Sequence, residues 1–181
     1  MFERIYIEIS NICNLQCSFC PVVERDNKLL SIDDFSKILG EAKPLTKEVC
    51  LHLMGEPLAH PDIDGILSLT DSYQVPVQLT TNGINIDRRE EMVLSKRSVR
   101  QINFSLQSYR DNFPDRDILP YLEKIVDFSE KAHRLNPDLY INFRLWNLTS
   151  DQGAQLENEK IYQYLEKRWG ISIERKVLVE S

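Results

Sequence analysis

Short apolar runs alternate along the chain with longer segments in which apolar residues recur at helical spacing. Six runs are strand-like and cover residues 3–10, 48–54, 75–81, 99–107, 139–146 and 171–179. Five helix-like segments lie between them, over residues 31–42, 61–72, 87–97, 118–135 and 157–168. The first helix is predicted to begin at Ser31, which forms a capping pair with Asp34. Strict alternation of strands and helices predicts an α/β protein with a parallel sheet.

Each predicted strand has one apolar and one polar face. In the first strand, residues 5, 7 and 9 are isoleucine, whereas Tyr6, Glu8 and Ser10 share the other face. The later strands repeat this division, and their polar faces carry His52; Gln78, Thr80 and Asn82; Asn103, Ser105 and Gln107; and Asn142 with Arg144. A doubly wound sheet would bury both faces under apolar residues. We therefore predict a partial (β/α)6 TIM-like barrel with parallel strands and an open, polar lumen. The alternative is a half-exposed sheet with helices on one side only.

The composition limits the classes of function. The chain has 181 residues, a length that favours one domain over residues 1–181. Its 22 Lys and Arg against 28 Asp and Glu give a formal charge of −6, which disfavours a nucleic-acid partner. Neither a signal-peptide pattern nor an apolar segment of membrane-spanning length is present, so we expect a cytoplasmic protein that does not enter a membrane.

The most distinctive residues follow the predicted strands directly. The segment CNLQCSFC, which contains Cys13, Cys17 and Cys20, comes after the first strand. MGEP (54–57) follows the second strand, TTNG (80–83) the third, and Ser105 with Gln107 closes the fourth. Parallel α/β proteins bind ligands at the carboxyl ends of their strands, so we expect the functional site there.

The cysteine pattern favours a metal centre. Three of the four cysteines lie within eight residues, where disulfides between them would be strained, and metal binding explains them better in a reducing compartment. Three thiolates leave one coordination position open for chemistry, as in a four-iron, four-sulfide (4Fe-4S) cluster with one free iron. A zinc site completed by a histidine is the alternative. His60 and His133 are expected at the surface, His52 in the lumen or core, and Cys50 as a packed or lumen-facing thiol.

Together these segments closely resemble the motifs of the radical S-adenosylmethionine (radical SAM) superfamily, in the same order and over nearly the whole chain. The resemblance rests on CNLQCSFC, MGEP, TTNG and Ser105, and on the aromatic Phe19 before the last cysteine of the loop. The fold of this family is a partial (β/α)6 barrel, in agreement with the two-faced strands. The resemblance implies that Cys13, Cys17 and Cys20 ligate a 4Fe-4S cluster. It also implies that the amino and carboxylate groups of S-adenosyl-L-methionine chelate the fourth iron.

The MGEP segment is similar to the family's Gly-Gly-Glu-Pro element. Gly55, Glu56 and Pro57 are thereby implied to hold the methionyl ammonium group through backbone and carboxylate. A carboxylate is a suitable partner for a cation in a desolvated site. Met54 replaces the first glycine of the element, so we expect a slightly different approach of the backbone there.

Other cofactor contacts are implied at the remaining strand ends. Ser105 would contact the ribose or the carboxylate, with Thr80 and Asn82 nearby, and Phe19 would pack near the adenine. Arg144, on the polar face of the fifth strand, would pair with the cofactor carboxylate or with an anionic substrate.

The implied activity is that of an oxidoreductase or maturase. Reductive cleavage of S-adenosylmethionine would give a 5′-deoxyadenosyl radical for hydrogen abstraction from a peptide or small-molecule substrate, with flavodoxin or ferredoxin as electron donor. Among the members of this family, the sequence most resembles those that carry a cysteine-rich auxiliary-cluster domain of the SPASM type, but it ends at Ser181 without that domain. We therefore expect either a minimal member or a C-terminally truncated core. A zinc-stabilised module or an electron-transfer iron–sulfur protein without S-adenosylmethionine chemistry remains the alternative.

Overall fold

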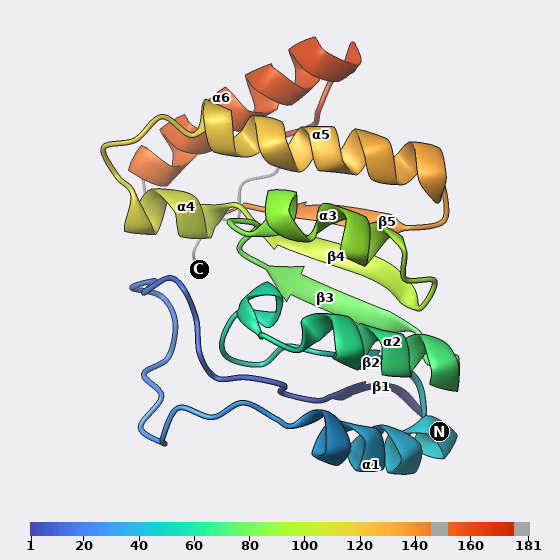
Figure 1. Cartoon of the computed structure of the whole chain (residues 1–181). Helices are drawn as coiled ribbons and strands as arrows, with labels where there is room; N and C mark the ends of the chain where they lie inside the picture. Colours follow the sequence, from blue (N-terminus) through green and yellow to red (C-terminus); the bar gives the residue numbers. More distant parts are fainter. Residues whose placement is uncertain (146–151, 176–181) are drawn as a thin grey trace.

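The sheet has five strands, all parallel and arranged in the order of the sequence. The computed structural model describes residues 1–145 and 152–175 (Figure 1). Its strands are β1 (Phe2–Tyr6), β2 (Thr46–Cys50), β3 (Val77–Thr81), β4 (Val99–Ser105) and β5 (Tyr140–Arg144). Crossovers between parallel strands generally share one hand, so connections between sequential neighbours put the connecting helices on one face of the sheet. This arrangement is the wall of an open barrel rather than a doubly wound sheet, so the predicted fold class is confirmed.

Six α-helices and two short 3₁₀ helices accompany the described strands. They are α1 (Ile32–Ala42), α2 (Ile63–Tyr73), α3 (Ile86–Leu94), α4 (Gln107–Asn112), α5 (Leu119–Leu135), α6 (Gln152–Trp169), η1 (Lys43–Leu45) and η2 (Pro57–Ala59). The capping prediction for α1 is confirmed, because Ser31 Oγ accepts a hydrogen bond from Asp34 N at 3.1 Å. The helix α4 was not predicted. Residues 171–175 form no strand, and the rest of the predicted sixth strand lies outside the described residues.

The core lies between the sheet and the helices that cover one of its faces. Val49 of β2, Leu79 of β3 and Phe104 of β4 are buried on this side. Phe104 meets Phe128 of α5 and Phe143 of β5 edge to face, with ring centroids 5.8 Å and 6.0 Å apart. Burial of one such ring contributes about 1.5–3 kcal/mol, so this packing fixes the strands whose ends carry the candidate site.

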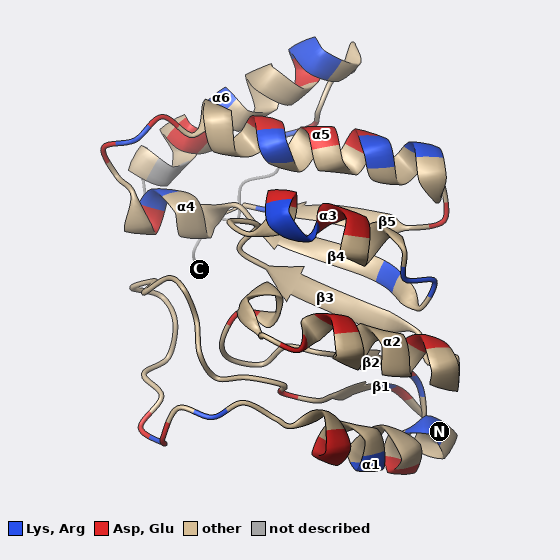
Figure 2. Ribbon diagram, in the orientation of Figure 1, with Lys and Arg blue, Asp and Glu red and all other residues tan. Residues whose placement is uncertain are grey.

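Charged residues lie mainly on the helices and the connecting segments, and the ribbon of β3 carries none (Figure 2). Ion pairs join neighbouring helices, such as Lys124 on α5 with Asp87 on α3 at 3.0 Å. Exposed pairs of this kind contribute only about 0–1 kcal/mol each. Within residues 1–145 and 152–175, no helix combines the length and apolar character that a membrane span needs.

Candidate cofactor site

The cysteine loop lies at the carboxyl end of β1, on the side to which the strand arrows point (Figure 1). Cys13 and Cys20 are exposed, Cys17 is half-buried, and all three thiols are free of disulfides. The backbone N–H of Cys20 donates to the carbonyl of Cys17 at 3.1 Å, which closes a tight turn between these two residues. Three unpaired thiols therefore share one short segment, as the predicted cluster requires.

Side-chain amides from elsewhere in the chain reach two of these sulfur atoms. Asn82 Nδ2, after β3, lies 3.8 Å from Cys13 Sγ, and Asn112 Nδ2, at the end of α4, lies 3.2 Å from Cys17 Sγ. Although Cys13 as a whole residue is exposed, partial desolvation of its thiol raises its pKa, and burial raises the pKa of Cys17 to about 11 against the opposing hydrogen bond from Asn112. Both thiols are thus protonated at neutral pH in the metal-free protein, and a bound metal would displace their protons.

The described residues contain no group of three His, Cys, Asp or Glu side chains close enough to share one metal ion. An iron–sulfur cluster does not need such convergence, because its ligands bind different iron atoms. The three cysteines and the amide donors beside them fit such a cluster, since hydrogen bonds to ligand sulfurs are part of how proteins tune it.

The turn that contains Gly55 packs directly against the start of the cysteine loop. Gly55 has a φ of +75°, and a Cβ atom there would lie 2.5 Å from the carbonyl oxygen of Ser10 and 2.8 Å from that of Ile12. The N–H of the next residue, Glu56, donates to the same Ile12 oxygen at 2.9 Å. Only glycine fits here, because the backbone needs a left-handed conformation and has no space for a side chain.

Glu56 is almost fully buried, with 2% of its surface exposed, and its carboxylate accepts three hydrogen bonds. Oε1 accepts from Leu58 N at 3.0 Å and from Thr81 Oγ1 at 2.6 Å, and Oε2 accepts from Asn82 N at 2.7 Å. Burial raises the pKa of Glu56, and the three hydrogen bonds oppose that rise. The carboxylate thereby joins the turn after β2 to the end of β3. Pro57 is buried beside it and begins η2.

The face of the sheet opposite the core helices carries a hydrogen-bonded row that we call the polar ladder: His52, Thr80, Asn103 and Asn142. Thr80 Oγ1 lies 3.0 Å from His52 Nε2, Asn103 Nδ2 donates to Thr80 Oγ1 at 3.2 Å, and Asn142 Nδ2 donates to Asn103 Oδ1 at 3.0 Å. Burial, followed by the nearby Arg144 cation, lowers the pKa of His52 to about 4, so the ring is neutral at pH 7. The predicted polar lumen face is thus present, and hydrogen bonds join three strand positions to His52, which lies two residues after β2.

Two buried side-chain atoms of this region lack a hydrogen-bond partner among the described residues: His52 Nδ1 and Gln107 Oε1. Gln107 is the first residue of α4, two positions after Ser105, which ends β4 and pairs in register with Arg144 of β5. Buried polar atoms are normally satisfied, so an orphaned acceptor at a strand end points to a missing donor. A ligand rich in amino and hydroxyl groups, as S-adenosylmethionine is, fits this position.

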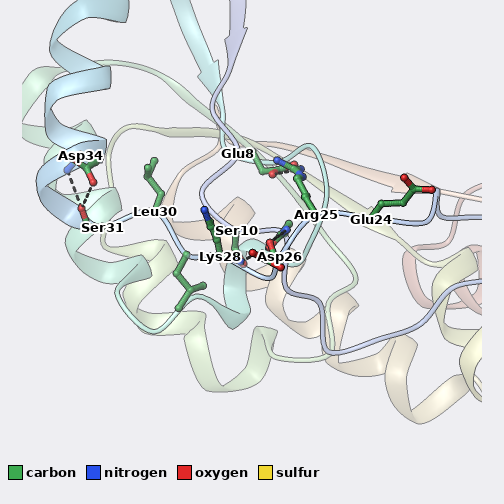
Figure 3. A pocket seen from close by; sticks show the side chains of 11 residues that line it. Glu8, Ser10, Glu24, Arg25, Asp26, Lys28, Leu30, Ser31 and Asp34 are labelled. Carbon is green, nitrogen blue, oxygen red and sulfur yellow. Dashed lines mark hydrogen bonds and ion pairs between the residues drawn. The ribbon is translucent and has the colours of Figure 1, made fainter.

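A cavity of about 730 Å³ lies between the end of β1 and the segment that leads into α1 (Figure 3). Glu8 lines it and forms an ion pair with Arg25. The other oxygen of Glu8 accepts from Met54 N at 3.0 Å. Glu8 therefore connects the wall of this cavity to the turn that contains Gly55.

The structure places the remaining predicted residues near the same edge. Phe19 is on the cysteine loop with 38% of its surface exposed, and Arg144 is an exposed residue at the end of β5. The sequence reasoning did not predict that Glu8 connects the segment of Arg25 to the turn after β2. It also missed α4, whose Asp111 and Asn112 contact the cysteine loop. Glu8 was recognised only as part of a polar strand face, and its partners lie too far along the chain to be read from spacing.

The surface prediction for His60 is wrong, whereas His133 is exposed and Cys50 is buried as expected. His60 has 1% of its surface exposed. Its Nε2 lies 3.2 Å from the Leu30 carbonyl oxygen, and its Nδ1 accepts from Asp62 N at 3.1 Å. With both ring nitrogens bonded, an imidazole can be buried at little cost.

Relatives of known activity match much of the chain. A GTP 3′,8-cyclase from Geobacter sulfurreducens is 31% identical over 131 residues, which are 67% of this chain and 39% of that protein. A PqqA peptide cyclase from Streptomyces rochei is 30% identical over 106 residues, or 56% of this chain and 29% of that protein. The chain spans between 29% and 41% of the length of the curated relatives that it matches.

Solved structures share the fold. Streptococcus suis SuiB bound to its precursor peptide SuiA has a TM-score of 0.66 at 20% identity, over 88% of this chain and 36% of that one. BtrN in complex with AdoMet and 2-DOIA has a TM-score of 0.54 at 14% identity, over 80% of this chain and 57% of that one. Residues 7–146 match the sequence model of the radical SAM superfamily. This match covers well over half of the chain, which therefore belongs to the radical SAM superfamily.

Proposed function

We propose that this chain is the core of a radical SAM enzyme that binds a 4Fe-4S cluster through Cys13, Cys17 and Cys20 and reductively cleaves S-adenosylmethionine. One observation carries the proposal: three free thiols share a loop that packs against the Gly55 turn, in a chain that matches this superfamily over residues 7–146. When bound, the cluster and cofactor would supply a 5′-deoxyadenosyl radical that takes a hydrogen atom from the substrate.

The residues around the loop would bind and orient the cofactor. Gly55 lets the backbone of its turn lie close to the loop, where carbonyl groups are available to the methionyl ammonium group. Glu56 fixes that turn to the end of β3 and adds negative charge beside it. Ser105, with Asn82 and Thr80 nearby, supplies polar groups for the ribose or the carboxylate.

Two further side chains would act on the periphery of the cofactor. Arg144 would attract the cofactor carboxylate or an anionic group of the substrate, because it brings a positive charge to the polar face. Phe19 would pack near the adenine, since it stands on the cysteine loop with part of its ring exposed.

We infer that the substrate is a peptide or a small molecule. The matched relatives include a PqqA peptide cyclase and a GTP 3′,8-cyclase, and SuiB was solved with the peptide SuiA, so both classes occur among similar proteins. The cavity beside Glu8 has about 730 Å³, within the usual range of about 300–1,000 Å³ for small-molecule sites. A flavodoxin or ferredoxin in the cytoplasm would deliver the electron.

Anaerobic reconstitution with iron and sulfide tests the proposal. The unaltered protein should bind about four irons and, with dithionite and S-adenosylmethionine, release 5′-deoxyadenosine. Cys17→Ala should lose both properties, and Cys50→Ala, which removes the buried cysteine outside the loop, should keep both. Equal 5′-deoxyadenosine from the unaltered protein and Cys17→Ala would refute S-adenosylmethionine cleavage. Zinc as the bound metal, without visible absorbance after reconstitution, would support the zinc alternative.

A further inference from the structure

The short helix α4 ends against the cysteine loop, although the two segments are far apart in the sequence (Figure 1). Asp111 receives two hydrogen bonds from Ser18, which lies 93 residues earlier: Ser18 N donates to Oδ2 at 2.5 Å and Ser18 Oγ donates to Oδ1 at 2.6 Å. The carboxylate thus fixes both the backbone and the side chain of a residue that lies between two of the cysteines.

The neighbouring Asn112 makes a second set of contacts with the loop. Its Oδ1 accepts from Gln16 N at 2.8 Å, while its Nδ2 donates to Cys17 Sγ at 3.2 Å and to the Ser108 carbonyl at 2.9 Å. The backbone donor of Gln16 and the backbone acceptor of Ser108 define which end of the amide carries the NH₂ group. The donor end of Asn112 therefore faces the sulfur of Cys17.

The core holds α4 in place. Tyr109 stacks on Tyr121 of α5 with ring centroids 4.4 Å apart. Tyr121 is buried and donates its hydroxyl to the Asn82 carbonyl at 2.7 Å. Ser108 Oγ donates to the Ser105 carbonyl at 2.6 Å, which joins the first turn of α4 to the end of β4. The contacts of Asp111 and Asn112 thus start from a helix that is itself anchored.

We propose that Asp111 and Asn112 are positioning residues that clamp the cysteine loop, and that Asn112 also tunes the iron–sulfur cluster through its hydrogen bond to Cys17. The clamp follows from the contacts alone, whereas the tuning rests on the proposed function. A hydrogen-bond donor stabilises the more negative charge that a thiolate ligand carries when the cluster is reduced. Asn112 would therefore raise the reduction potential of the bound cluster, and its hydrogen bond would hold the Cys17 side chain in one orientation.

Amide exchange in the metal-free protein, followed by NMR, tests the clamp. Asp111→Ala should speed exchange at Ser18, and Asn112→Leu at Gln16, by about tenfold or more, because each amide loses its acceptor. Asn112→Asp should keep Gln16 protected, since it retains the accepting oxygen. Asp115→Ala, which removes an exposed carboxylate just after α4, should leave both amides unchanged. Unchanged exchange in Asp111→Ala and Asn112→Leu would overturn the clamp.

The reduction potential of the reconstituted cluster tests the tuning. Asn112→Leu and Asn112→Asp should both shift the potential to more negative values, because both remove the donor to Cys17. Asn136→Asp is the matched control. It makes the same Asn-to-Asp change at the C-terminus of α5, where Asn136 Oδ1 likewise accepts a hydrogen bond from a backbone N–H, that of Asp138. Potentials of the Asn112 variants equal to those of the control and the unaltered protein would overturn the tuning. If no cluster forms in the unaltered protein, the proposed function and the tuning both fail, while the exchange experiment still decides the clamp.

Discussion

Replacement of Gly55 by alanine should move the turn after β2 away from the cysteine loop. The new Cβ atom would lie 2.5 Å from the Ser10 oxygen and 2.8 Å from the Ile12 oxygen, and both are backbone atoms that cannot rotate away. Either the turn or the segment that leads into Cys13 has to shift. The matched control is Gly170→Ala after α6, where φ is +65° but, chain neighbours aside, no atom of residues 1–145 and 152–175 lies within 4 Å of the added Cβ.

The two substitutions share one cost and differ in another. An alanine in the left-handed region costs about 1–2 kcal/mol at either position. Overpacking adds about 1–3 kcal/mol at Gly55 only. For a chain of this length, each kcal/mol lowers the melting temperature by about 2–4 °C. Gly55→Ala should therefore melt about 2–12 °C below Gly170→Ala.

Thermal unfolding of the metal-free variants, monitored by circular dichroism, measures this difference. Iron content after anaerobic reconstitution is the second readout, because displacement of residues 10–12 changes the entry into Cys13. Gly55→Ala should bind less iron than Gly170→Ala. Equal melting temperatures of the two variants would refute the steric account, and equal iron contents would refute the connection between the turn and the loop.

The further predictions concern the polar groups of three residues, Glu56, His52 and Tyr121. Glu56→Gln should lower the free energy of unfolding in urea by about 1–3 kcal/mol, because the new amide opposes the N–H of Asn82. Burial raises the pKa of the Glu56 carboxyl above its ordinary value of 4.5. The unaltered protein should therefore lose stability as the pH rises from 4.5 through the raised pKa, and Glu56→Gln should lose less stability over the same range. The pKa of His52 is lowered from 6.5 to about 4, so stability should fall as pH drops from 6.5 toward 4, with a flatter profile in His52→Gln. Tyr121→Phe should lower the free energy of unfolding in urea by about 1–3 kcal/mol, because the buried Asn82 carbonyl loses its donor. Tyr109→Phe should lower it by less than about 1 kcal/mol, because the hydrogen bond of the Tyr109 hydroxyl is longer and exposed.

The alternation of periodicities predicted the five described strands, and five of the helices, because local pattern and burial agree in these elements. In β2 and β3, for example, Val49 and Leu79 lie against the helices while Thr80 joins the polar ladder. The carboxyl-end rule then predicted which loops would meet. These features depend on residues that are near one another in the chain, so they can be predicted from local sequence patterns.

The missed features depend on distant residues instead. The helix α4 has the sequence QSYRDN, which lacks an apolar stripe, and its support comes from Tyr121 and from the cysteine loop. His60 is buried because Leu30 and Asp62 satisfy its ring, and no local pattern indicates such partners. Glu56 was recognised by its motif, but its bond to Thr81 joins residues 25 positions apart.

The polar ladder has a consequence for the entropy of ligand binding. A polar side chain that is ordered only when a ligand arrives costs about 0.5–1.5 kcal/mol of binding free energy. His52, Thr80, Asn103 and Asn142 already hold one another through hydrogen bonds of 3.0–3.2 Å. Their rotamer freedom is lost when the sheet folds, before any ligand is present. The folding of the sheet, rather than the arrival of a ligand, fixes the polar groups on this face of the barrel wall.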